Sequence, residues 1–169
     1  VWSPDVWAVI DDSLPEKLPV VGSSREACGM LRGELGHEWG LGEVVVSAGG
    51  GDNMMAAIGT GNVGPGCVTA SLGTSGTIFA CAENPVVDPR GEIAAFCDSN
   101  DRWLPLLCTM NVTVATELFR KMFGWDHARV EREISSVPAG ADGLVFLPYL
   151  QGERTPNLPD GCGVLHGMN

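Results

Sequence analysis

Short runs of apolar residues, separated by glycine, proline and polar turns, follow one another along the whole chain. In residues 67–82, apolar and polar positions alternate on either side of "GTSG", which predicts a β-hairpin with strands at 67–73 and 77–82. Two further strands are predicted by "EIAAFCDS" and "RWLPLLCTM", which meet at "NDR", where Asn and Asp favour a turn. Continuous apolar runs predict buried strands in "VVVSA" and in "GLVFLPYL", the second ending at Pro148. A last short strand is expected after the polar loop that begins with "GERTP".

Other segments have the apolar spacing of helices. Ser23 or Ser24 is a candidate N-cap, with Glu26 close behind, for a helix that glycines at 33 and 36 would end. Residues 53–61 predict a short helix of small and apolar residues that its own glycines stop. Residues 1–22 show no clear period and predict a loop with at most one short helix.

Two more helices are predicted in the second half of the chain. One apolar stripe in residues 111–124 predicts a helix that Gly124 ends. Its members are Val112, Ala115, Phe119, Met122 and Phe123. Residues 126–136 predict a polar helix capped by Asp126.

The order of these elements indicates an α/β protein with two parts. Near "GPG", residues 64–66, the predicted order changes from helices and single strands to a run of antiparallel strands. This change places the predicted boundary between residues 1–66 and 67–169. The chain starts without Met and stops at Asn169 directly after a predicted strand, so we expect it to be a segment of a longer protein.

Composition and charge exclude several classes of function. A hydrophobic share of 44% and a charged share of 18% suit a folded globular protein, and the apolar runs are too short for a membrane span or a secretory signal. A net charge of −11 repels nucleic acid, so no nucleic-acid partner is expected. An anionic ligand would need backbone amides or a divalent metal to offset the same repulsion.

The cysteines and histidines show no metal-binding spacing. The six cysteines form no CxxC pair, and their apolar surroundings predict small buried thiols in a reducing cytoplasm. The three histidines are far apart in the sequence, so no zinc site is predicted.

The stretch "GGGDN" follows the predicted strand at 44–48. It is either a strand-to-helix turn in which Asp52 or Asn53 caps the next helix, or a carboxylate at the carboxyl end of a strand with room for a ligand. Ligands of open α/β sheets bind at that edge, and a carboxylate there is able to accept a proton from a substrate hydroxyl.

The turn "SLGTSGT" also has two interpretations. It is either a hairpin loop that needs the freedom of Gly73 and Gly76, or an anion site in which small residues expose amides and hydroxyls to a phosphate. It lacks the Gly-Lys-Ser/Thr ending of a Walker A loop.

A third motif, "FLPYLQGERTP", follows the last predicted buried strand. Glu153 and Arg154 are either a solvated surface pair or part of a ligand-binding or interdomain loop.

The order "AGGGDN", "SLGTSG", "FLPYLQGERTP" resembles the FGGY carbohydrate kinases, most closely their pentulose branch, from about residue 20 to Asn169. The resemblance implies a ribonuclease H-like, actin-like ATPase fold of two α/β lobes. Residues 1–66 would end the sugar-binding lobe, and residues 67–169 would begin the nucleotide-binding lobe. Family enzymes transfer the γ-phosphoryl group of MgATP to a sugar hydroxyl, and in the pentulose branch this makes D-xylulose 5-phosphate from D-xylulose.

The resemblance also implies roles for individual residues. Asp52 would be the general base and would contact the acceptor hydroxyl, while Asn53 would bind a neighbouring sugar hydroxyl. The phosphates of ATP would lie near three residues of the second motif, Gly73, Thr74 and Ser75. Asn111 and Thr113, in the sequon-like "NVT", match a family helix start near the nucleotide. The "GERTP" loop would organise closure of the lobes.

Two family parts have no match in the chain: the N-terminal phosphate hairpin with its metal-associated Asp, and the C-terminal adenosine site. We therefore expect ATP and Mg²⁺ as cofactors of the parent enzyme, no metal ligand within these residues, and no activity of the segment alone. Met54 and Met55 stand where the family has smaller residues. A ribulose, gluconate or glycerol kinase of this family, and a non-catalytic binding module, remain alternatives. A homodimer of the full-length protein is a further expectation.

Overall fold

The computed structural model describes residues 2–168. The chain forms two compact units: unit 1 comprises the chain up to Met55 together with Ser99–Asp101, and unit 2 comprises the rest. The division falls inside helix α4, Asp52–Gly59. The predicted boundary at residues 64–66 lies inside unit 2, and the assignment of residues 1–66 and 67–169 to two enzyme lobes stays a prediction.

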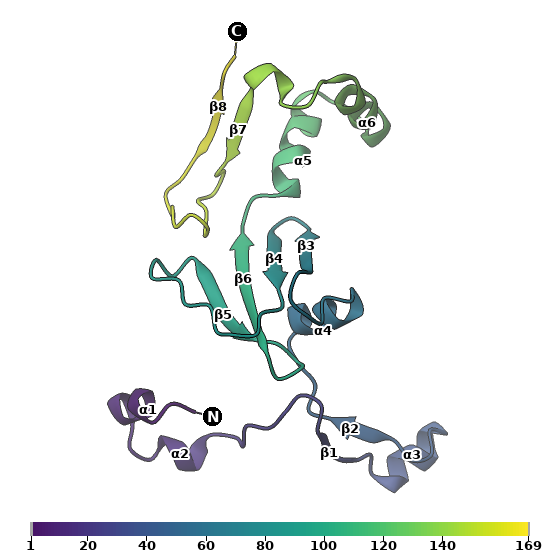
Figure 1. Cartoon of the computed structure of the whole chain (residues 1–169). Coiled ribbons are helices and arrows are strands. Elements are labelled where there is room, and N and C mark those ends of the chain that lie inside the picture. Colours follow the sequence, from purple (N-terminus) through teal and green to yellow (C-terminus); the bar gives the residue numbers. More distant parts are fainter. Residues whose placement is uncertain (1, 169) are drawn as a thin grey trace. The chain divides into compact units, whose positions relative to one another are not determined.

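Unit 1 is small and consists mainly of short helices and one strand pair (Figure 1). Its elements before α4 are α1 Pro4–Ile10, α2 Leu14–Lys17, β1 Ala27–Met30, α3 Gly33–Trp39 and β2 Val45–Ser47. The two strands pair antiparallel, with Ala27 opposite Ser47 and Met30 opposite Val45. Asp101 accepts a hydrogen bond from the Ser23 hydroxyl at 3.1 Å and thereby joins the short 99–101 segment to this unit.

Three predictions for unit 1 are wrong. Residues 1–22, predicted to be a loop with at most one short helix, contain the two helices α1 and α2. The helix expected after Ser23 is strand β1, because its backbone bonds to β2, and Gly33 begins helix α3 instead of ending one. The strand at 44–48 exists, but Val45 is 60% exposed because only β1 lies beside it within the described part of unit 1.

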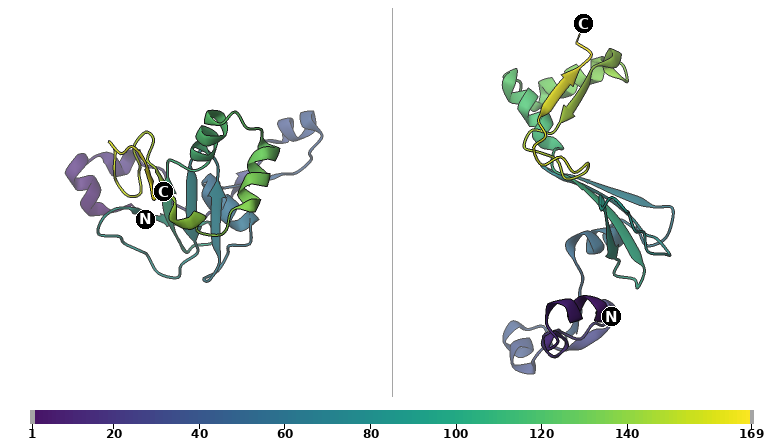
Figure 2. Two further views of the ribbon diagram at one scale, coloured as in Figure 1. Left: turned by 90° about the horizontal axis from the view of Figure 1, so that it is seen from above. Right: turned by 90° about the vertical axis from the view of Figure 1, so that its left-hand side faces the viewer.

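Unit 2 is built on a four-stranded antiparallel sheet. Its strands are β3 Val68–Leu72, β4 Gly76–Ala80, β5 Ile93–Cys97 and β6 Trp103–Thr109. They lie in the order β3, β4, β6, β5, so that β6 is flanked on both sides (Figure 1). Figure 2 shows the same sheet, in teal, from two other directions. The predicted hairpin and both additional strands are confirmed, and Leu72 pairs with Gly76 across the tight turn.

Helices and a second strand pair follow the sheet of unit 2. They are α5 Thr113–Met122, α6 His127–Ser136, the 3₁₀ turn η1 Ala141–Gly143, β7 Val145–Pro148 and β8 Gly163–His166. The predicted cap of α6 is confirmed, because the Asp126 carboxylate accepts from the Arg129 amide at 2.7 Å. In α5, Ala115 is buried as expected, whereas Met122 and Phe123 of the predicted stripe are exposed. Strand β7 is likewise half-exposed and not buried as predicted, because β8 is the one strand that pairs with it among residues 2–168.

The apolar core of the described residues lies in unit 2. Phe79 and Leu104, on the neighbouring strands β4 and β6, are the largest fully buried side chains. Asn62 is buried among them at 2% exposure: its amide nitrogen donates to the Phe79 carbonyl and its oxygen accepts from the Cys81 amide. Buried polar groups are normally paired in this way, so Asn62 ties the chain after α4 to the sheet.

The prediction of buried cysteines is correct for Cys81 alone. Cys108 is half-buried and the remaining four thiols are exposed, because the segments that carry them lie outside the core. No helix within residues 2–168 has both the length and the apolar character needed to cross a lipid bilayer.

Candidate functional site

Asp52 is the first residue of α4, directly after the glycines that follow β2. The Met55 amide donates to the Gly51 carbonyl at 2.9 Å, so the helix starts at the glycine and Asp52 occupies its first turn. A carboxylate is favourable at this end of a helix. One oxygen of Asp52 accepts from the Asn53 backbone amide at 2.8 Å and from the Asn53 side chain at 3.3 Å. The carboxylate is exposed, so its position is compatible with proton transfer from a ligand.

One of the glycines before Asp52, Gly50, is required by close packing within unit 1. A Cβ on Gly50 would overlap the Ser99 hydroxyl oxygen and would lie 2.7 Å from the Met55 methyl carbon. Any larger residue would therefore force the turn away from Ser99. This contact explains one of the three glycines by packing, without reference to a ligand.

The predicted phosphate-binding turn connects β3 and β4 in unit 2. The Gly73 amide donates to the Ser75 carbonyl at 2.9 Å, which closes the turn and uses the Gly73 donor. Thr74 and Ser75 are exposed at its tip. Of the three predicted residues, Thr74 and Ser75 are therefore the better placed to offer backbone amides to an anion.

The start of α5 holds this turn from the other side. The Thr113 amide donates to the Gly73 carbonyl and the Val112 amide donates to the Thr74 carbonyl, each at 3.0 Å. The first amides of a helix lack partners within the helix, and here the turn carbonyls satisfy two amides at the start of α5. The structure thus brings together four of the five residues predicted to bind nucleotide: Gly73, Thr74, Ser75 and Thr113.

The fifth residue, Asn111, is buried, and both hydrogens of its amide are used inside the protein. Its nitrogen donates to the Gly152 carbonyl at 2.8 Å and to Glu153 Oε2 at 3.1 Å. Asn111 therefore has at most its side-chain oxygen to offer a ligand.

Glu153 is the partner of Asn111 and is only 3% exposed. Its Oε1 accepts from the Met110 amide at 2.6 Å and from the Arg154 amide at 2.7 Å. Burial raises the pKa of Glu153, but the hydrogen bonds from Met110, Asn111 and Arg154 outweigh it and hold the pKa below 4.5. The interpretation of Glu153 and Arg154 as a solvated surface pair is therefore wrong, because this carboxylate faces the interior.

A cavity of about 530 Å³ lies between the turn, α5 and the segment after β7. Its lining includes Thr74, Asn111, Glu117, Lys121 and Gln151. Arg120 forms an ion pair with Glu117 at 2.8 Å, whereas Lys121 forms no ion pair with any residue of the described part. Lys121 therefore brings a positive charge to a cavity whose size suits a small-molecule ligand.

Sequence reasoning missed Lys121 and misjudged the surroundings of Glu153. The cavity side of α5 carries Val114, Glu117, Leu118 and Lys121, a spacing of three and four residues that was readable as one helix face. The burial of Glu153 had no such signal, since two of its three partners, Met110 and Asn111, lie more than forty positions earlier.

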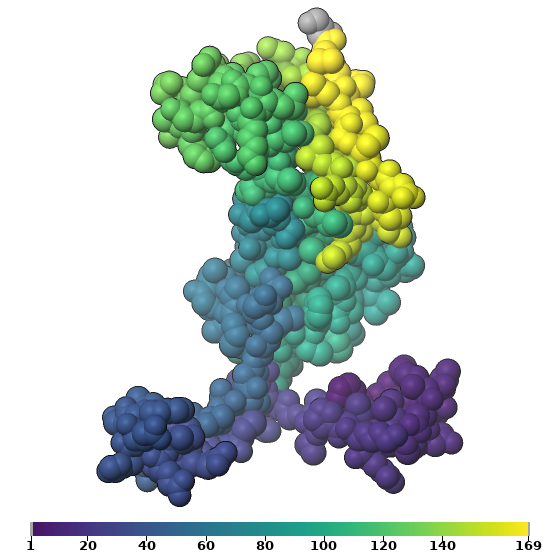
Figure 3. All heavy atoms as spheres, turned by 180° about the vertical axis from the view of Figure 1, so that it is seen from behind, coloured from purple at the N-terminus to yellow at the C-terminus, as the bar shows by residue number. Residues whose placement is uncertain are grey.

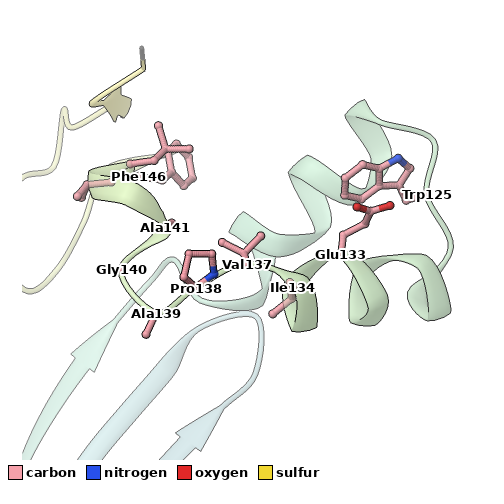
Figure 4. A pocket seen from close by; sticks show the side chains of 11 residues that line it. Trp125, Glu133, Ile134, Val137, Pro138, Ala139, Gly140, Ala141 and Phe146 are labelled. Carbon is pink, nitrogen blue, oxygen red and sulfur yellow. The ribbon is translucent and has the colours of Figure 1, made fainter.

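A second cavity, of about 830 Å³, contains none of the predicted residues. It is lined mainly by apolar side chains between α6 and β7, and Figure 4 shows Trp125 and Glu133 at one end and Phe146 at the other. Three aromatic contacts lie beside it, among them Phe119 edge-on to Phe146 at 4.8 Å.

No cluster of three or more His, Cys, Asp or Glu side chains able to hold a metal ion occurs within residues 2–168. Mg²⁺ in phosphate sites is commonly held by one or two carboxylates together with phosphate oxygens and water, so this finding concerns only a metal site built wholly from protein side chains.

Comparison with curated proteins shows consistent similarity to xylulose kinases, while no protein-family model matches the chain. It is 39% identical to the xylulose kinase of Haemophilus influenzae over 171 residues, which cover 99% of this chain and 35% of that protein. It is 42% identical to the xylulose kinase of Streptomyces coelicolor over 154 residues, or 91% of this chain and 30% of that protein. The chain thus spans about one third of the length of the curated relatives it matches.

Solved structures show the same similarity. A xyloylose kinase from Brucella ovis matches 89% of this chain and 32% of its own, with a TM-score of 0.81 and 36% identity. A gluconate kinase from Lactobacillus acidophilus matches 100% of this chain and 35% of its own, with a TM-score of 0.87 at 21% identity, which supports the fold alone. The predicted α/β fold of the actin-like sugar kinases is confirmed.

Proposed function

We propose that this chain, a homologue of the xylulose kinases, is part of an enzyme that phosphorylates D-xylulose. The reaction would transfer the γ-phosphoryl group of ATP to a sugar hydroxyl and yield D-xylulose 5-phosphate and ADP. The observation that carries the proposal is the 39% identity to a xylulose kinase across 99% of the chain. The gluconate kinase likeness is too distant in sequence to favour a second substrate.

In this proposal Asp52 is the general base. A sugar hydroxyl is a weak acid, and the transition state of phosphoryl transfer is loose, so the base needs only to orient the hydroxyl and accept its proton late. The exposed carboxylate at the start of α4 supports this role. Asn53, beside it, would donate to and accept from a neighbouring hydroxyl of the sugar and so select the attacking oxygen.

The nucleotide would bind at the β3–β4 turn of unit 2. The exposed amides of Thr74 and Ser75 would face the phosphates, with Gly73 shaping the turn and Thr113 holding it. The cavity beside Thr74 supports this placement, because Lys121 adds a positive charge there in a chain whose net charge is −11.

ATP would enter as its Mg²⁺ complex. Because the described residues hold no cluster of metal ligands, no step of the mechanism is assigned to the ion here. A cytoplasmic location and a homodimer of the full-length protein belong to the same proposal, and sedimentation of that protein would test the dimer.

A chimera tests the function directly. Residues 1–169 would replace the matching segment of the Haemophilus influenzae xylulose kinase, and ATP consumption would be measured with D-xylulose. We expect activity in the chimera and none in the isolated chain, which spans one third of its relatives. A folded chimera that consumes no ATP with any sugar would contradict the proposal, and a preference for ribulose, gluconate or glycerol would favour a related kinase.

The role of Asp52 is tested in the same chimera. Asp52→Asn is expected to lower kcat by about 10²–10⁴-fold, with the KM for D-xylulose changed only slightly. Asp12→Asn, which alters another exposed carboxylate of unit 1, is the matched control and should retain full activity. Turnover of Asp52→Asn at the unmodified rate would show that the base is another residue.

A further inference from the structure

The loop after β7, which carries Glu153 and Thr155, is bonded to two stretches of unit 2 that lie far from it in the sequence. Through Met110 and Asn111, Glu153 fastens this loop to the segment between β6 and α5. A second bond, from Thr155 to the Glu92 carbonyl, ties the same loop to the chain just before β5. Figure 3 shows this C-terminal segment, in yellow, lying against the teal part of unit 2.

The segment held by Glu153 is also the one that holds the predicted nucleotide turn. Directly after Met110 and Asn111, the amides of Val112 and Thr113 donate to the turn carbonyls. Both sets of hydrogen bonds therefore lie within four consecutive residues, 110–113. A shift of this segment cannot occur without stretching its bonds to the turn.

Close packing at Gly76 couples the two parts further. A Cβ at Gly76 would lie 2.7 Å from a methyl carbon of Val112, nearer than ordinary van der Waals contact allows. The base of the turn thus rests directly on the Val112 side chain. Displacement of Val112 would either push on the turn or open a gap beneath it.

We propose that Glu153 is a positioning residue for the nucleotide-binding turn at residues 73–75, acting through residues 110–113. This inference rests on the proposed function for its nucleotide, but the mechanical link stands on the contacts alone. Glu153 does not reach the turn itself; its effect passes through the backbone amides of Val112 and Thr113.

The charge of Glu153 is essential to the link. Three N–H donors, from Met110, Asn111 and Arg154, converge on one carboxylate in a nearly solvent-free place. Hydrogen bonds to a charged group are the stronger kind. An amide in its place would turn an NH₂ group toward a donor, and that contact would become repulsive.

The test combines two measurements on Glu153→Gln, with Glu131→Gln of the exposed face of α6 as the matched control. Hydrogen exchange of the Val112 and Thr113 amides is measured in the 169-residue chain. We expect exchange about tenfold faster or more in Glu153→Gln, with no change in the control and none at Phe79 in the sheet. In the chimera we expect the KM for ATP to rise about tenfold, with the KM for D-xylulose unchanged.

The two measurements separate the inference from the proposed function. Unchanged exchange at Val112 and Thr113 in Glu153→Gln would overturn the inference, whatever the enzyme activity. Faster exchange with an unchanged KM for ATP would also overturn the inference, since the turn would then move without changing how the enzyme binds ATP. Absence of all activity in the unmodified chimera would overturn the proposed function instead, and the exchange data would still decide whether Glu153 holds the turn.

Discussion

Asn62 is a buried polar side chain whose removal should destabilise unit 2. Its amide nitrogen donates to the Phe79 carbonyl at 3.1 Å and to the Thr69 hydroxyl at 3.2 Å. Its oxygen accepts from the Cys81 amide at 3.2 Å. Asn62→Ala would delete all three bonds. The Phe79 carbonyl in β4 and the Cys81 amide just after β4 would then lose these partners.

The magnitude follows from those two groups. An unsatisfied buried backbone group costs about 1–3 kcal/mol, so the substitution should lower the free energy of unfolding by about 3 kcal/mol. For a chain of this size that corresponds to a fall in Tm of about 6–12 °C. Loss of the contact with Thr69, near the surface of the sheet, should add little.

The assay is urea unfolding of the chain at low concentration, followed by tryptophan fluorescence, with Trp103 in β6 as a reporter inside the sheet. Asn157→Ala is the control, because Asn157 is exposed in the loop before β8 and its replacement should change stability by less than about 0.5 kcal/mol. If Asn62→Ala were as stable as the control, the hydrogen bonds of Asn62 would not be what attaches the chain after α4 to the sheet.

Three other outcomes are expected. Asp126→Ala should destabilise α6 by about 1 kcal/mol through loss of its N-cap, seen as reduced helical circular dichroism at intermediate urea. Gly50→Ala should cost about 1–3 kcal/mol through overlap with Ser99 and speed limited proteolysis of unit 1, whereas Gly33→Ala, which has open space, should not. Because folding holds the pKa of Glu153 below 4.5, its contribution to stability is complete above that pH and is lost as the pH falls through the lower folded value. Urea unfolding from about pH 6 to about pH 3 should therefore show an acid-dependent loss that is smaller in Glu153→Gln, and equal slopes would contradict the assignment.

The sequence was informative where one local pattern determined the structure. The hairpin over β3 and β4 combines alternating side chains with a glycine turn, and both features act within a few residues. The cap at Asp126 is similarly local. Such elements need no information from distant segments.

The sequence-based predictions fail where contacts between segments that are distant in the sequence determine the local structure. Ala27 and Met30 have helical spacing, yet the backbone of this stretch pairs with β2, and pairing between strands outweighs a weak helical preference. The sequence left Glu153 either a surface charge or part of a binding loop, and could not show its burial because two of its donors, Met110 and Asn111, come from another part of the chain. For the candidate site, sequence motifs supplied the residues, and the structure supplied the contacts that bring four of them, Gly73, Thr74, Ser75 and Thr113, together in unit 2.

The placement of β6 between β4 and β5 has a consequence for how the protein is made. During synthesis β3, β4 and β5 leave the ribosome before β6, so only the first hairpin is able to form early. One side of β4 and the whole of β5 have no strand partner in this sheet until β6, Trp103–Thr109, emerges. Translation through this stretch is thus the interval in which the nascent chain is most open to misassociation, and a pause there would lengthen the exposure.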